Sequence, residues 1–62
     1  MSNLPKRLMS EAARFMLAAV VAKQQGNAAE ADWNRFLARF FYQVAESPDA
    51  IARLELDQRR AA

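Results

Sequence analysis

The chain contains neither cysteine nor histidine among its 62 residues. Without them the chain has no disulfide bonds and no thiolate or imidazole ligand for a structural zinc site. A domain this short buries only about 60% of the surface that its unfolded chain exposes, and small domains usually compensate with disulfides, metals or oligomerisation. Self-association or a protein partner is therefore the remaining route to stability, and we expect no cofactor and no metal.

Long apolar segments are also missing. The longest uninterrupted apolar run extends from Phe15 to Ala22, which is far short of the ~20 residues that a membrane-spanning helix needs. Glu11 and Arg14 interrupt the only stretch that resembles the apolar region of a signal peptide, so we expect no such peptide. The sequence predicts one cytoplasmic domain over residues 1–62, without a membrane span.

The residue types that most often perform catalysis are absent or are used elsewhere. Without histidine and cysteine, acid–base chemistry would fall to carboxylates, tyrosine, lysine and serine. Glu11 and Asp32 lie on polar helix faces, and Glu30 and Ser47 occupy positions typical of helix caps. No four acidic residues converge in the pattern, which argues against a carboxylate metal site. We expect that the protein is not an enzyme.

The single glycine and the two prolines mark the helix ends. Gly26 is suited to the left-handed residue that closes a helix, and Asn27 is a good N-cap for the next one. Ser47 followed by Pro48 is typical of another helix start. We therefore expect helices at about residues 5–25, 28–45 and 48–59. The predicted fold is all-α: an antiparallel helical hairpin with a short third helix, forming a four-helix-type bundle as a homodimer.

Apolar residues make up 53% of the chain, and five of the six aromatic residues lie between Trp33 and Tyr42. Trp33, Phe36 and Phe40 share one side of the second helix, and we expect them in the core of the hairpin or of a dimer. For Leu17, Leu37 and Phe41, core and partner surface remain equally open. The predicted partner-binding residues are Leu17, Leu37, Phe41 and Tyr42. In the third helix, Ala50, Ile51 and Leu54 are expected to pack against the hairpin, with Leu56 pointing elsewhere.

The net charge is only +2, and the excess of basic residues lies in the N-terminal segment. Five basic residues are candidates for a phosphate-contacting face, namely Lys6, Arg7, Arg14, Arg35 and Arg39. An ordinary solvated surface explains them better. The leading hypothesis is a small non-enzymatic protein–protein interaction module, acting through an aromatic and aliphatic helix face as an adaptor, inhibitor or accessory subunit. The alternative is a nucleic-acid-binding regulator built as a dimer of hairpins.

Overall fold

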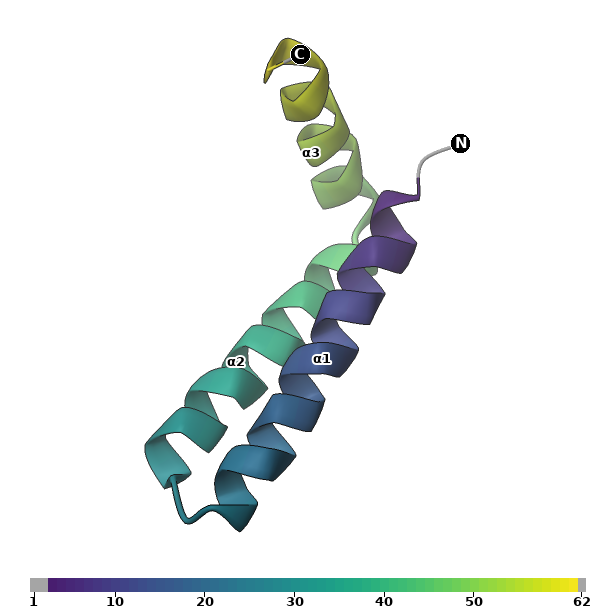
Figure 1. Cartoon of the computed structure of the whole chain (residues 1–62). Coiled ribbons are helices and arrows are strands. Elements are labelled where there is room, and N and C mark those ends of the chain that lie inside the picture. Colours follow the sequence, from purple (N-terminus) through teal and green to yellow (C-terminus); the bar gives the residue numbers. More distant parts are fainter. Residues whose placement is uncertain (1–2, 62) are drawn as a thin grey trace.

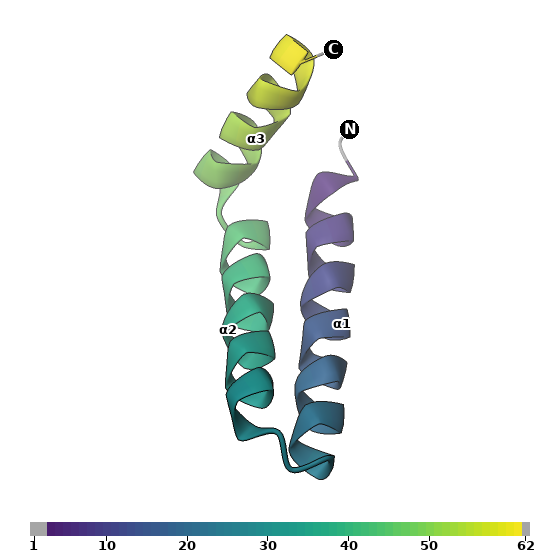
Figure 2. The ribbon, with the colours of Figure 1, turned by 60° about the vertical axis from the view of Figure 1, so that its left-hand side comes forward.

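The computed structural model describes residues 3–61 and is helical in all its regular structure, with no strand in that range. Helix α1 spans Leu4–Gln24, α2 spans Ala28–Ala45 and α3 spans Pro48–Ala61. Helices α1 and α2 run side by side in opposite directions, and α3 continues beyond the open end of this hairpin (Figures 1 and 2). The predicted all-α class and the antiparallel hairpin are confirmed, and the helix boundaries lie within two residues of those expected.

The turn between α1 and α2 is closed by backbone hydrogen bonds that depend on glycine. Gly26 has a φ of 76°, in the left-handed region where residues with a side chain are strained. This conformation lets the Asn27 N–H donate to the Ala22 carbonyl at 2.9 Å, and the Gly26 N–H to the Lys23 carbonyl at 3.0 Å. The pair of bonds satisfies carbonyls that the end of a helix would otherwise leave unpaired. Gly26 therefore ends α1 as predicted.

Asn27 also begins α2. Its side-chain oxygen accepts a hydrogen bond from the Glu30 N–H at 3.1 Å, and its side-chain nitrogen donates to the Glu30 carboxylate at 2.8 Å. In the usual capping box the glutamate would bond the backbone N–H of the capping residue. Here that N–H is already bonded to Ala22, so Glu30 binds the side-chain amide instead. Gly26 and Asn27 thus end α1 and begin α2 within a very short turn.

A second N-cap separates α2 from α3. The Ser47 hydroxyl accepts a hydrogen bond from the Ala50 N–H at 3.3 Å, and Pro48 occupies the first position of α3. Proline is tolerated there because the first helical turn has no partner for its N–H groups. The predicted helix start is confirmed, although it changes the direction of the chain enough for α3 to leave the hairpin axis (Figure 1).

Small residues form the contact between α1 and α2. Ala12 and Ala19 are seven residues apart on α1, and Ala31 and Ala38 are seven apart on α2. All four are buried, three of them to 2% exposure. A seven-residue repeat keeps one stripe of each helix facing its neighbour, and small side chains allow a close approach of the two backbones. The hairpin core is therefore an alanine seam.

The alanine seam occupies the hairpin core, where Trp33, Phe36 and Phe40 were among the expected residues. Trp33, Phe36 and Phe40 retain 59%, 57% and 51% of their accessible surface, so they are not buried between α1 and α2. On a helix with 3.6 residues per turn they lie on the side of α2 opposite to Ala31 and Ala38. As an assignment to the hairpin core the expectation is wrong, because helix spacing and the alanine repeat place a different stripe of α2 against α1.

Helix α3 is attached to the hairpin by a small contact. Ile51 is buried, Ala50 is partly buried, and Leu54 and Leu56 are 37% and 44% exposed. Only the first turn of α3 therefore packs as predicted, and Leu54 does not. The molecule measures 42 × 18 × 16 Å. Its radius of gyration, 13.8 Å, exceeds the about 11 Å of a compact domain of this length. The chain is thus elongated and has little interior.

Candidate protein-interaction surface

The exposed aromatic residues of α2 lie on one face, which we call the α2 outer face. Its residues follow one another at alternating steps of four and three, and they are Ala29, Trp33, Phe36 and Phe40, followed by the polar Gln43. All five are exposed. This spacing is that of a coiled-coil contact stripe, in which apolar residues recur every three to four positions. Helix α2 therefore has two such stripes on opposite sides: one packs against α1, and the other faces solvent.

Ring contacts give the α2 outer face its shape. Trp33 and Phe36 stack with ring centroids 5.6 Å apart and an interplanar angle of 18°. Phe40 meets Phe41 edge to face at 5.8 Å, and Phe41 stacks on Phe15 of α1 at 5.4 Å. Offset stacking and edge-to-face contacts are the favoured geometries of aromatic pairs. Each exposed ring of the α2 outer face is therefore in contact with another aromatic ring.

The predicted partner-binding residues divide into two groups. Leu17 is 66% exposed and lines a depression together with Glu30 and Asn34 of α2. Leu37 and Phe41 are half-buried, and the stack of Phe41 on Phe15 makes it part of the hairpin contact. Tyr42 is 48% exposed and lies near Met9 and Met16 of α1. The structure does not bring these four side chains together on one surface.

Tyr42 interacts with a carboxylate one turn further along α2. A hydrogen bond with Glu46, together with the negative charge of that residue and a little desolvation, raises the pKa of the Tyr42 phenol above its usual range. The phenol thus stays protonated at neutral pH, and it is a hydrogen-bonding group at the edge of the hairpin.

The basic residues are distributed over different sides of the hairpin. Arg14 pairs with Glu11 at 2.8 Å, on the flank that also contains Asn34 of α2. Arg35 lies on the opposite flank, where its guanidinium is 3.6 Å from Asp32. Two of the candidate phosphate ligands are thus on different flanks, and both have an acidic neighbour.

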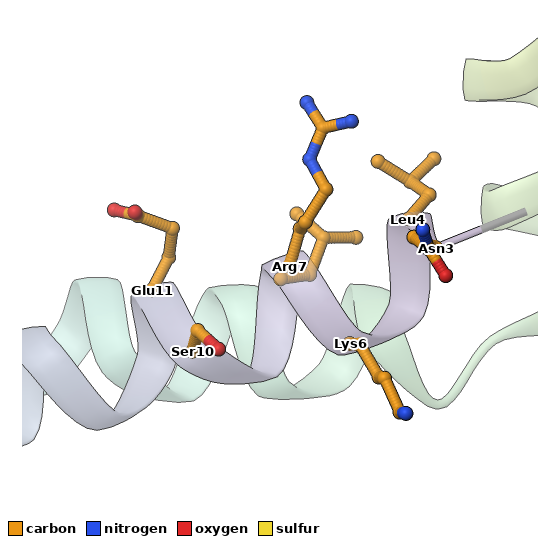
Figure 3. A pocket seen from close by; sticks show the side chains of 7 residues that line it. Asn3, Leu4, Lys6, Arg7, Ser10 and Glu11 are labelled. Atoms are coloured by element: carbon orange, nitrogen blue, oxygen red, sulfur yellow. The ribbon is translucent and has the colours of Figure 1, made fainter.

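The basic residues in the first turns of α1 are also separated from one another. A shallow depression there is lined by Asn3, Leu4, Lys6, Arg7, Leu8, Ser10 and Glu11. Lys6 and Arg7 project to opposite sides of the helix (Figure 3). Arg39 belongs to the flank of Met9 and Met16. The five candidate residues therefore do not form one basic face on the hairpin, and no observation favours nucleic acid as the ligand.

Within residues 3–61, no helix is long and apolar enough to cross a bilayer. No group of three or more carboxylates in the same range is close enough together to hold a metal ion.

Comparison with known proteins returned no relative. No family model matches the chain, no curated protein matches it, and no solved structure matches its fold.

The sequence pattern did contain the signal that separates the core from the surface. Alanines recur at seven-residue spacing in both long helices, at Ala12 and Ala19 and again at Ala31 and Ala38. Two stripes with the same repeat mark the faces that can approach most closely. The size of the aromatic side chains of α2 is therefore a poorer indicator of burial in this hairpin than the alanine repeat.

Proposed function

We propose that the protein is a non-enzymatic protein–protein interaction module that assembles as a homodimer through the α2 outer face. The observation that carries this proposal is the exposure of Trp33, Phe36 and Phe40, each above 50%, on a helix whose other side is already packed. Aromatic residues of this kind dominate the energetic centres of protein interfaces. Monomeric soluble proteins seldom leave a contiguous patch of this sort in water.

The accessible surface supports the same proposal. It amounts to 5019 Å² for a chain of 7.0 kDa, about a quarter more than the ~4,000 Å² expected for a compact monomer of that mass. The excess is comparable to the ~800 Å² that each partner contributes to a standard protein interface. A homodimer would bury the excess surface. The sequence has no cysteine and no histidine, so it cannot form a disulfide or a thiolate or imidazole metal site instead.

In such a dimer the two α2 helices would lie in the centre of a four-helix assembly, with the two α1 helices outside. This arrangement suits the distribution of polar residues on α2. Asp32, Arg35, Arg39 and Glu46 fall between the alanine seam and the α2 outer face, along one edge of the helix. They would remain at the rim of the interface, where charged residues are common. The assembled pair would serve as an adaptor, an inhibitor or an accessory subunit.

A single truncation tests the proposal. Phe36→Ala removes a ring from the middle of the α2 outer face and leaves the alanine seam intact. We expect the solution mass, measured by light scattering over a dilution series, to change from dimer to monomer at a concentration at least tenfold higher than for the native chain.

The matched control is Leu17→Ala, which also removes an exposed apolar side chain, 66% accessible, but from α1 and outside the α2 outer face. The Leu17→Ala dimer should dissociate at the same concentration as the dimer of the native chain. If the native chain is a monomer at every concentration, self-association is refuted and the face serves a different protein. If Leu17→Ala weakens the dimer and Phe36→Ala does not, the interface lies on α1.

A further inference from the structure

The charges beside the α2 outer face specify how two copies would meet. Asp32, Arg39 and Glu46 are seven residues apart, so they form one row along the edge of this face. Their charges alternate in sign. An alternating row with the period of the contact stripe pairs favourably with a copy of itself in only some alignments. The row therefore discriminates between dimer geometries that the aromatic residues alone would allow.

We propose that the two α2 helices pack antiparallel about a two-fold axis, with Trp33 facing Phe36 of the second copy and Asp32 facing Arg39 of the second copy. This inference rests on the proposed self-association and specifies its direction and register. In a two-fold arrangement every contact occurs twice, so two ion pairs of this kind flank the aromatic centre. The same register places Phe40 against Ala29, a large side chain against a small one.

A shift by one heptad reverses the electrostatics. In that antiparallel register Arg39 faces Arg39 of the second copy, and Asp32 faces Glu46. All the contacts along the row are then between like charges, which oppose association. Charge thus selects one of the two antiparallel registers that keep the aromatic stripe in contact.

In a parallel alignment, the row of Asp32, Arg39 and Glu46 would not meet charged residues of opposite sign on the second copy. In parallel coiled coils the residues on one edge of a stripe meet those on the opposite edge of the neighbouring stripe. The opposite edge of the α2 outer face carries Glu30, Leu37 and Val44. In the staggered pairing of a parallel coiled coil, Asp32 would face Leu37 and Arg39 would face Val44. The parallel dimer would bury charged groups beside apolar ones and form no ion pair along this row.

Both residues of the proposed ion pair are accessible. The Asp32 side chain is 77% exposed, and its contact with Arg35 is long, at 3.6 Å, so a carboxylate oxygen can accept a second guanidinium. Arg39 is exposed and makes no ion pair within residues 3–61. Neither side chain needs to leave a strong interaction in order to bind the second copy.

Charge reversal tests the geometry. Asp32→Arg and Arg39→Asp each convert two attractive contacts into two repulsive ones, and each should raise the dimer dissociation constant roughly ten- to hundredfold. The double variant Asp32→Arg/Arg39→Asp restores opposite charges across the axis and should return to within about threefold of the native value. Sedimentation equilibrium at low salt, where screening is weakest, measures all four proteins.

The control is the same pair of reversals on α3, Asp57→Arg and Arg53→Asp, at exposed positions away from α2. These should leave the dissociation constant near the native value. A native dimer in which Asp32→Arg is neutral or stabilising contradicts the proposed register, because the shifted register predicts tighter binding and the parallel dimer predicts no change. A double variant as weak as the single ones also contradicts it. A native chain that never dimerises refutes the proposed function itself.

Discussion

Single residues decide where each helix of this protein starts and stops. The turn after α1 contains Gly26 with its positive φ and Asn27, whose backbone N–H closes α1 while its side chain caps α2. An added Cβ at Gly26 would meet no atom within 4 Å. The requirement for glycine is therefore conformational and does not arise from crowding. This local chemistry acts within a few residues, which is why it was predictable from the sequence.

The cap at Asn27 supports a specific prediction. Asn27→Ala removes the acceptor for the Glu30 N–H, and we expect a loss of about 1 kcal/mol in the free energy of unfolding. Denaturant unfolding followed by circular dichroism measures it, at one protein concentration because the stability of a dimer depends on concentration.

The control for this prediction is Asn27→Ser, which keeps a capping oxygen and should stay within a few tenths of a kcal/mol of the native chain. Equal losses for the alanine and serine variants would show that the cap contributes nothing. The difference between the two variants therefore measures the capping hydrogen bond that the Glu30 N–H donates to the side chain at position 27.

At the scale of the helices, close backbone approach determines which face is buried. The seam of alanines packs α1 on α2, and only one aromatic pair, Phe15 with Phe41, takes part in that contact. The larger rings of α2 remain outside. Interaxial distance depends on the side chains at the contact, so bulky residues between the helices would force them apart along their whole length.

The seam can be tested by overfilling it. Ala38 is 2% exposed in the contact between the helices, and Ala38→Leu should destabilise the hairpin by about 1–3 kcal/mol because the larger side chain forces the helices apart. Thermal unfolding of the variant measures the loss.

The exposed Ala13 of α1 provides the comparison, because Ala13→Leu adds the same volume at a position that is exposed rather than buried. Alanine and leucine are both strong helix formers, so the Ala13→Leu variant should unfold near the temperature at which the native chain unfolds. A stable Ala38→Leu protein would contradict close packing at the seam.

Helix positions were predictable from short stretches of sequence, whereas the buried face of α2 can be predicted only by comparing the alanine repeats of both long helices. The caps at Asn27 and Ser47 act locally and identified both helix starts. The choice between two heptad stripes on α2 depends on which one α1 can approach, and that is a property of two segments together. Trp33, Phe36 and Phe40 were expected in the core of the hairpin or of a dimer, and the packing of α1 on α2 excludes the hairpin core. The residues of the candidate site were therefore predictable from the sequence, and their place in a dimer stays a prediction.

The whole molecule is long, thin and poor in interior. Its 42 Å length and its surface of 5019 Å² leave seven apolar residues in the buried set among residues 3–61, and five of them are alanines. Alanine contributes little apolar area, so the hydrophobic free energy of the isolated hairpin is small. The aromatic residues that would supply more lie on the α2 outer face. Self-association would bury them and would make folding and assembly depend on each other.

The emission of Trp33 tests the central claim most directly, because it is the only tryptophan and is 59% exposed in the single chain. Burial of the α2 outer face between two copies predicts blue-shifted emission at high concentration. On dilution the emission should shift to the red at the same midpoint at which light scattering shows the mass to halve. A dimer whose emission remains that of a solvent-exposed indole at every concentration would contradict the account, because its interface would then lie elsewhere.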